Sequence, residues 1–218
     1  MNIRFLLIVI LFALVFQSLV VKAQWQKTNG PFGGIVLCLA NDGARLYAGT
    51  NGGGVFLSTN NGNSWTQINT GLNVFVINSI EINGSNVFAG TVAGMFLSTD
   101  NGAHWSAINS GLTNTDIYSI AVSGTNVFVG TSTGIFSSIN NGSSWTPVNN
   151  GIPNNSIIRS LAVIGSSIFA TTSGGIFLSN NNGTSWAAVN TGLTNMNVQA
   201  LAVSGSNIFA GTNTGVFL

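Results

Sequence analysis

From residue 24 onward the chain alternates between short apolar runs and turns rich in Gly, Asn, Ser and Thr. One unit comprises residues 119–122, 126–131, 134–138 and 144–149. Within each run apolar and polar side chains alternate with a period of two residues, which is typical of a half-buried β-strand. The turns between runs are short, so consecutive strands pair as antiparallel hairpins. The pattern predicts an all-β fold.

This four-strand unit recurs through the chain, and the tryptophans mark its period. They follow one another at spacings of 40, 40, 40 and 41 residues: Trp25, Trp65, Trp105, Trp145 and Trp186. Phe128 and Phe136 lie on neighbouring strands of one predicted hairpin, where they can stack across it. Four antiparallel strands in about 40 residues is the size of one propeller blade. We therefore expect a β-propeller of four-stranded antiparallel blades.

The two ends of the sequence carry complementary parts of a blade. Residues 24–30 resemble a fourth strand with no first three before it, and residues 201–218 supply three strands with no fourth. Placing the N-terminal strand beside the last one would close a ring of about five blades without exposed edges. The alternative is a fragment of a larger propeller, because the sequence stops where the other copies enter their next turn.

Residues 1–23 have the layout of a secretory signal peptide. Arg4 provides a positive charge before an unbroken apolar run over residues 5–16. Residues 21–23 then place small or branched side chains at the positions of a cleavage site before Gln24. The segment therefore predicts export.

A retained membrane anchor is the alternative, because residues 5–21 are just long enough to span a bilayer. Gln17 and Ser18 interrupt that stretch and favour cleavage. We expect a signal peptide over residues 1–23 and a propeller domain over residues 24–218. The protein is then secreted, or placed at the surface or in the periplasm of a bacterium-like cell.

Few charged side chains lie beyond the leader, where three basic residues face four acidic ones. Nucleic acids and anionic membranes are bound through clusters of Lys and Arg, which this composition lacks. The single cysteine, Cys38, closes no internal disulfide and fits no metal-site spacing. We expect no nucleic-acid partner, no membrane contact after cleavage, no metal, no cofactor and a monomeric protein.

The turn between the third and fourth strands of each unit repeats the pattern S-x-[DN]-x-G-x-x-W. The residues that define it are Asn60, Gly62 and Trp65; Asp100, Gly102 and Trp105; Asn140, Gly142 and Trp145; and Asn181, Gly183 and Trp186. The pattern resembles the Asp box, or bacterial neuraminidase repeat, of sialidases, endoglucanase-type glycoside hydrolases, sortilin and photosystem II assembly-factor propellers. The resemblance implies a propeller in which these turns are structural and lie opposite the active-site face.

The resemblance to sialidases raises the question of catalysis. Those enzymes use three arginines, a Tyr/Glu pair and an aspartic acid, whereas the mature chain has Arg45, Arg159 and a single glutamate, Glu81. A glycosidase with paired carboxylates needs two acids about 5–10 Å apart. Glu81 with Asp116 is the one pair to consider, since both begin neighbouring blades. His104, the only histidine, occupies a variable turn position, so we expect no catalytic residue.

One position at the start of the first strand differs in every copy, although most of the repeat is nearly invariant. It is occupied by Leu37, Asn78, Tyr118, Arg159 and Gln199. We expect these residues to surround the mouth of the central channel, on the face away from the Asp-box-like turns. Freely drifting surface loops are the alternative.

We therefore predict a secreted, non-catalytic binding scaffold whose partner is a protein or a glycan. Tyr118 and Arg159 are expected to dominate the contact, because Tyr and Arg often carry interface energy. A degenerate or partial glycoside hydrolase of the same repeat family is the alternative function. A purely structural surface protein without a soluble ligand is a third possibility.

Overall fold

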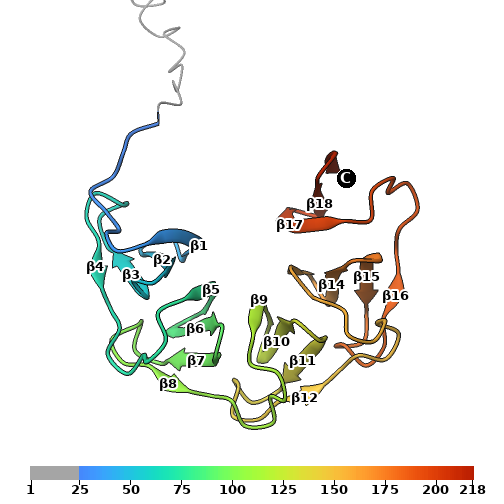
Figure 1. The fold of residues 1–218 in the computed structure, drawn as a ribbon, viewed down its shortest axis with the longest axis horizontal. Helices are drawn as coiled ribbons and strands as arrows, with labels where there is room; N and C mark the ends of the chain where they lie inside the picture. Colours follow the sequence, from blue (N-terminus) through green and yellow to red (C-terminus); the bar gives the residue numbers. More distant parts are fainter. Residues whose placement is uncertain (1–24) are drawn as a thin grey trace, which may run out of the picture.

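The strands of the protein are grouped into five small sheets that stand side by side around an arc (Figure 1). The computed structural model describes residues 25–218, so the predicted leader lies outside the described residues. In those residues every regular element is a strand, and no helix with the length and hydropathy of a membrane span is found. The predicted all-β propeller with five blades is confirmed.

Each of the first four blades is a four-stranded antiparallel sheet whose strands follow in chain order. Blade 1 contains β1 (Ile35–Asn41), β2 (Leu46–Asn51), β3 (Val55–Ser58) and β4 (Thr66–Gln67). Blade 2 contains β5 (Ile77–Asn83), β6 (Asn86–Thr91), β7 (Gly94–Ser98) and β8 (Ser106–Ala107). Blade 3 contains β9 (Ile117–Ser123), β10 (Asn126–Thr131), β11 (Ile135–Ser138) and β12 (Thr146–Pro147).

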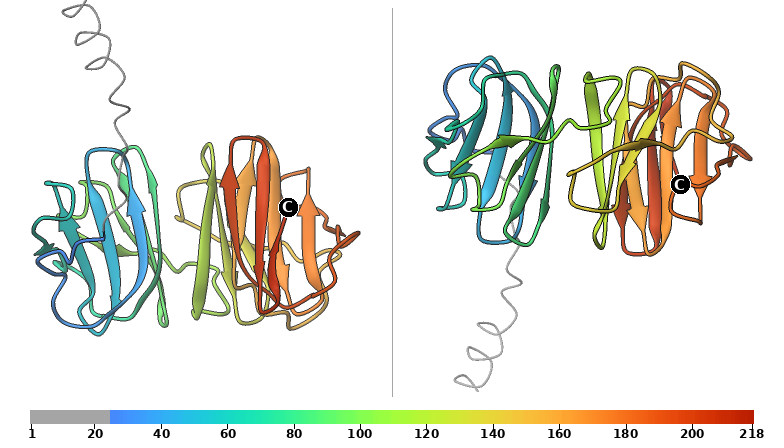
Figure 2. Two further views of the ribbon diagram at one scale, coloured as in Figure 1. Left: turned by 90° about the horizontal axis from the view of Figure 1, so that it is seen from above. Right: turned by 90° about the horizontal axis from the view of Figure 1, so that it is seen from below.

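Blade 4 contains β13 (Leu161–Ile164), β14 (Ser167–Thr172), β15 (Gly175–Ser179) and β16 (Ala187–Ala188). Blade 5 has three strands, β17 (Val198–Ser204), β18 (Asn207–Thr212) and β19 (Gly215–Phe217). The first strand of every blade faces the centre of the arc, and the short fourth strand lies at the periphery (Figure 1). Figure 2 shows that the strands run between two faces, on which the connecting loops gather.

The hydrophobic core lies between the blades, because alternate residues of each strand face the two neighbouring blades. In β10, Val127 and Val129 pack with Phe88 of blade 2. Phe128, between them in sequence, packs instead with Ile158 and other residues of blade 4. All of these side chains are almost completely buried. The period of two read from the sequence therefore describes blade-to-blade packing on both sides of one sheet.

The arc is open, and blades 1 and 5 lie at its two ends (Figure 1). Val216 of β19 is 72% exposed, whereas Met95, its counterpart in blade 2, is fully buried. At the other end Leu39 of β1 is 69% exposed, whereas the equivalent Ile80 is 5% exposed. Each end therefore presents an apolar sheet face to solvent. The equivalent sheet faces of the inner blades are buried against a neighbouring blade.

The N-terminal segment does not make the pairing with the last blade that would close the ring. Asn29 forms a bridge with Ser64 of blade 1, and Thr28 is the side chain nearest to Gly62. Trp25 is 99% exposed, and β18 is the only strand paired with β19 in the described chain. The physical reason is that the outer strand of a blade is only two residues long, so backbone hydrogen bonds to its own blade stabilise it little. Its position is set by packing against the turn of the next blade.

Candidate functional site

One face of the arc carries the turns that join the third and fourth strands. In blade 2, Gly102 N–H donates to Ser98 Oγ at 2.7 Å, and His104 N–H donates to Asp100 Oδ1 at 2.9 Å. His104 Nδ1 lies 2.7 Å from Asp100 Oδ2. The side-chain and backbone hydrogen bonds from His104, with that from the Ser98 hydroxyl, hold the pKa of Asp100 well below its usual range. The Asp100 carboxylate and the His104 imidazole are therefore both held by hydrogen bonds within the turn.

The other three turns use an amide and a hydroxyl in place of the carboxylate and the imidazole. Each Asn Oδ1 accepts the backbone N–H of a serine four residues later, and each Asn Nδ2 donates to that serine's Oγ. The pairs are Asn60–Ser64, Asn140–Ser144 and Asn181–Ser185. An amide N–H needs an acceptor and a carboxylate needs a donor. A turn with Asn therefore has a serine four residues later, whereas the turn with Asp100 has His104 at that position.

The tryptophans of these turns connect neighbouring blades. Trp105 Nε1 donates to the carbonyl of Ile68 in the preceding blade at 2.8 Å, and the indoles of Trp145 and Trp186 make the same bond. Trp65 Nε1 is buried and has no partner among the described residues. Gly62, Gly102, Gly142 and Gly183 all have positive φ. In the described chain these turns contribute hydrogen bonds to the packing between blades, and none of their twelve residues lines the cavities described below.

The opposite face carries the variable position at the start of the first strand. In four blades this residue lies in a β-bulge, because the pairing skips Leu37, Asn78, Tyr118 and Gln199. Arg159 lies two residues before Leu161, the first paired residue of the fourth blade, and is exposed. A bulge leaves one residue unpaired and re-aims its side chain, and bulges are common beside binding sites. This shared geometry was not evident from the sequence.

The five side chains have different local roles. Asn78 Nδ2 donates to the carbonyl of Ile117 at 2.9 Å and so joins blades 2 and 3. Gln199 Nε2 donates to Asn197 Oδ1 at 2.6 Å, and Leu37 is 43% exposed. Asn78 is therefore partly committed to holding the ring together, which the sequence comparison of the repeats could not indicate.

Tyr118 and Arg159 lie near one another on blades 3 and 4. Tyr118 Oη donates to Asp116 Oδ2 at 2.8 Å, and this hydrogen bond raises the pKa of the phenol while the charge of Arg159 lowers it. In the described chain no carboxylate pairs with Arg159, whereas Arg45 is paired with Asp42. The structure therefore brings an aromatic ring and a free guanidinium to one part of the rim.

Arg159 also lines a cavity of about 170 Å³ between blades 4 and 5. Its other walls are mostly uncharged and polar: Asn155, Thr172, Ser173 and Asn197, with Ile157 and Val198. An unpaired cation among hydroxyl and amide groups suits a ligand with a carboxylate and further hydrogen-bonding groups.

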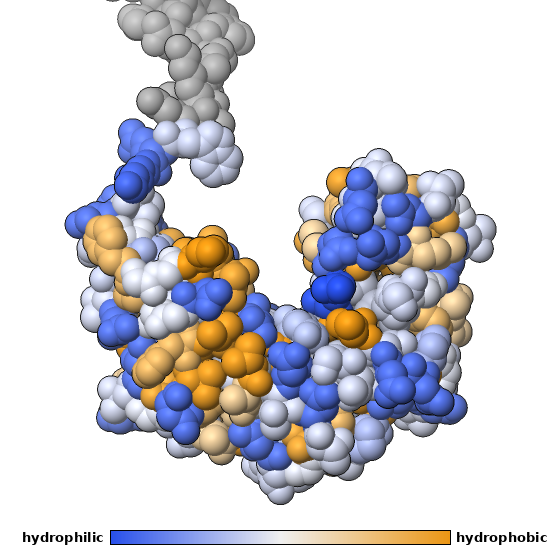
Figure 3. Space-filling model, in the orientation of Figure 1, coloured by the Kyte–Doolittle hydropathy of each residue, from blue (hydrophilic) through white to orange (hydrophobic). Residues whose placement is uncertain are grey.

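The rim is divided between an apolar and a polar part. Figure 3 shows apolar residues gathered over blades 1 and 2 and a more hydrophilic surface over blades 3 to 5. Phe75 and Val92, in loops of blades 1 and 2, are 44% and 46% exposed. The Phe75 carbonyl accepts hydrogen bonds from Gly52 N–H at 2.8 Å and Gly54 N–H at 3.1 Å, so this loop is fixed in place.

Glu81 lies on the inner wall of the arc, in a groove of about 320 Å³. The other residues lining this groove are apolar and come from β9, β13 and β17. Burial raises the pKa of the Glu81 carboxyl to about 7. Glu81 is level with Ala121, because each pairs with a phenylalanine of its own blade.

The one acid pair considered from the sequence is widely separated. Asp116 is hydrogen-bonded to Tyr118 at the rim. Glu81 is level with Ala121 of β9, which comes five residues after Asp116 in the sequence. At about 3.3 Å per residue this is roughly 16 Å along the strand, beyond the separation of paired glycosidase carboxylates. No group of three or more His, Cys, Asp or Glu residues suited to a metal is found within residues 25–218.

Comparison with known proteins gives a family match and several structural neighbours. The DUF6242 beta propeller domain matches residues 109–218. No curated protein matches the sequence.

Solved propellers resemble the chain at low sequence identity. The extracellular domain of the one-component system BT4673 from B. thetaiotaomicron has 20% identity and a TM-score of 0.75 over 88% of this chain. An ancestral GH74 enzyme has 22% identity and a TM-score of 0.66 over 85%. PorZ, a surface component of the type-IX secretion system of Porphyromonas gingivalis, has 15% identity and a TM-score of 0.69 over 89%. The chain spans 28%, 28% and 34% of their respective lengths.

Proposed function

Because the chain belongs to the family of the DUF6242 beta propeller domain, we propose that it is a secreted, non-catalytic propeller that binds a protein or glycan. Extracellular and surface proteins among its structural neighbours support a location outside the cytoplasm. The Asp-box-like turns support the same general class of repeat propeller. The chemistry of the ligand follows from the side chains on this chain's own rim.

The observation that carries the proposal is the unpaired guanidinium of Arg159 beside a polar cavity on the rim. Tyr118 adds an aromatic face nearby, already oriented by its hydrogen bond to Asp116. Guanidinium groups bind carboxylates through paired hydrogen bonds, and aromatic rings stack on sugars or apolar side chains. We therefore expect an acidic sugar or a peptide carboxylate to occupy this part of the rim.

The glycoside hydrolase alternative has less support. The GH74 neighbour shares the fold at 22% identity, which carries no catalytic residue over to this chain. Hydrolysis by paired carboxylates requires a second acid near Glu81, and the lining of its groove contains no other carboxylate. Binding without turnover is the function that these side chains favour.

Screening against acidic oligosaccharides and carboxylate-bearing peptides tests this proposal. The wild type is expected to bind at least one class, and Arg159→Ala is expected to bind that ligand at least about tenfold more weakly. Arg45→Ala is the matched control, because Arg45 is already paired with Asp42 in a turn of blade 1. Hydrolysis of a bound glycan would contradict the non-catalytic assignment. Absence of any ligand, or full affinity in Arg159→Ala, would contradict the rim site.

A further inference from the structure

The groove around Glu81 lies on the inner wall of the arc, where the first strand of each blade faces the centre (Figure 1). Strands β5, β9, β13 and β17 line it, and each is an edge strand of its own sheet. The edge of a sheet carries backbone N–H and C=O groups that have no partner within that sheet. The groove therefore offers backbone hydrogen-bonding groups as well as side chains.

Glu81 is the exception at a position that is otherwise alanine. Glu81 pairs with Phe88 across blade 2, and each counterpart pairs with the equivalent aromatic residue of its own blade. The counterparts are Ala40, Ala121, Ala162 and Ala202. Ala121 and Ala162 are 5% and 8% exposed, so the position suits a small apolar side chain. The carboxyl group of Glu81 is therefore not required by the packing of the blades.

The Glu81 side chain lies among apolar neighbours and has no counter-charge. It is on the same face of blade 2 as Phe88, and that face packs against Ile120 and Val122 of blade 3. Neither of the ion pairs found within residues 25–218 includes Glu81, and burial alone raises its pKa to about 7. Above pH 7 the groove therefore holds a negative charge that the described chain does not neutralise.

Glu81 is also the source of the charge in this part of the molecule. Among the described residues no other ionisable side chain lines the groove. The titratable groups on the strands packed against β5 are Cys38 of β1, Tyr47 of β2 and Tyr118 of β9. Burial raises the pKa of Cys38 to about 11 and raises that of Tyr47, and the hydrogen bond to Asp116 raises that of Tyr118. All three groups are therefore neutral at pH 8.

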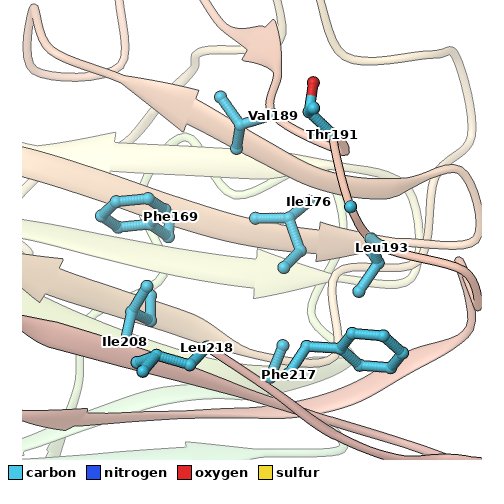
Figure 4. A pocket seen from close by; sticks show the side chains of 10 residues that line it. Phe169, Ile176, Val189, Thr191, Leu193, Ile208, Phe217 and Leu218 are labelled. Carbon is cyan, nitrogen blue, oxygen red and sulfur yellow. The ribbon is translucent and has the colours of Figure 1, made fainter.

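The cavity of about 250 Å³ between blades 4 and 5 has apolar walls but, in the described chain, no charged side chain (Figure 4). Phe169, Ile176 and Ile208 contribute to its walls, and Thr191 is its one polar side chain. No side chain there selects a charged ligand. The groove around Glu81, of about 320 Å³, differs because it combines apolar walls with a carboxyl group. Its size is within the range of small-molecule sites, about 300–1,000 Å³.

We propose that the groove binds a small molecule that carries a primary ammonium group on an apolar chain. The ammonium group lies against the Glu81 carboxylate, and its remaining N–H groups donate to backbone carbonyls at the edges of the strands. The apolar chain lies along Val122, Val163 and Val203, which occupy the same position in their strands.

The lining favours a primary ammonium over a quaternary one. A primary ammonium has three N–H donors, which suit one carboxylate and several backbone carbonyls. A quaternary ammonium has no donor and is usually bound by aromatic rings, which are absent from the groove's described lining. The ligand is therefore held by charge-assisted hydrogen bonds at one end and by apolar contact along its chain.

This site is separate from the rim site and does not depend on the rim ligand. Glu81 is level with Ala121, three residues beyond Tyr118 along β9. At about 3.3 Å per residue, the two positions are roughly 10 Å apart along the strand. Arg159 lines the rim cavity and is not part of the groove.

Calorimetric titration of the purified protein with hexylamine at pH 8 tests the proposal, with hexanol and hexyltrimethylammonium as control ligands. Hexylamine is expected to bind at least about tenfold more tightly than either control, the effect of one charge-assisted hydrogen bond. Glu81→Gln is expected to weaken hexylamine binding at least about tenfold. Asp42→Asn is the matched control, because it removes the same charge from a turn of blade 1 outside the groove.

The pH dependence of binding reports the role of the carboxylate directly. Hexylamine affinity is expected to rise at least about tenfold from pH 5.5 to pH 8, because the ammonium binds the ionised form of a carboxyl whose pKa is about 7. Hexanol affinity, and hexylamine affinity in Glu81→Gln, are expected to stay level. Absence of hexylamine binding, equal affinity for hexanol, or full affinity in Glu81→Gln would overturn the proposal. Tighter binding of a lysine-containing peptide would overturn the assignment of a small molecule.

Discussion

The indole N–H of Trp105 donates to the carbonyl of Ile68 at 2.8 Å and bonds the turn of blade 2 to blade 1. Trp105 is 4% exposed and belongs to the hydrophobic cluster shared by the two blades. Removing it deletes a hydrogen bond and leaves a cavity at a blade interface. The turn face is therefore a structural part of the ring.

Trp105→Ala is expected to destabilise the fold by roughly 3–5 kcal/mol, the usual cost of truncating a buried aromatic residue. Equilibrium unfolding in urea measures this change. Ligand binding at the rim, measured under conditions where the variant is folded, is expected to match the wild type. An unchanged unfolding midpoint would show that the tryptophan does not hold the blades together.

Gly71→Ala is expected to destabilise the protein by about 2–4 kcal/mol, because the residue has positive φ and its new methyl group meets the backbone of Trp105. Gly192→Ala is the matched control, since Gly192 has φ +87 but no neighbour within 4 Å. The control is expected to lose only the conformational part, about 1 kcal/mol. Equal losses of stability for the two variants in thermal unfolding would show that the contact between the new methyl group and the Trp105 backbone does not destabilise the protein.

Glu81→Gln is expected to stabilise the protein in a pH-dependent way. Burial raises the folded pKa of the Glu81 carboxyl to about 7 from an ordinary value of 4.5, so the folded state holds the proton more tightly than the unfolded chain. By linkage the resulting penalty is absent below about pH 4.5, grows between pH 4.5 and 7, and is complete above pH 7. The variant is therefore expected to exceed the wild type by roughly 1–3 kcal/mol at pH 8.

Unfolding at pH 4 and pH 8 measures this difference, which is expected to vanish at pH 4. Glu81→Ala is a useful second variant, because the equivalent residues Ala40, Ala121, Ala162 and Ala202 are all alanine. The same difference at both pH values would show that the carboxyl is solvated in the folded protein.

The blades could be predicted from the sequence because their signals are local. The alternating runs place Val127 and Phe128 on opposite faces of one strand, and the tryptophan spacing marks each blade. The opening of the ring could not be predicted in this way. It depends on the angle between neighbouring blades, which is set by how residues such as Phe88 and Ile117 pack across an interface.

The position of the candidate site in the repeat could be proposed from the sequence, but its geometry could not. Variation between repeats identified the position of Tyr118 and Arg159, and the structure adds that four of the five equivalents are bulge residues. The bond from Asn78 to Ile117 depends on a distance between blades that no periodicity encodes. The isolation of Glu81 from Asp116 required the strand register.

A double-mutant cycle on Tyr118 and Arg159 tests the central claim that one ligand is held jointly at this part of the rim. The dissociation constant of the best acidic glycan or peptide would be measured by calorimetry for the wild type, Tyr118→Ala, Arg159→Ala and the double variant. We expect each single change to weaken binding at least about tenfold, with a coupling energy of about 0.5–3 kcal/mol between the two sites. Wild-type affinity in both single variants would contradict the account.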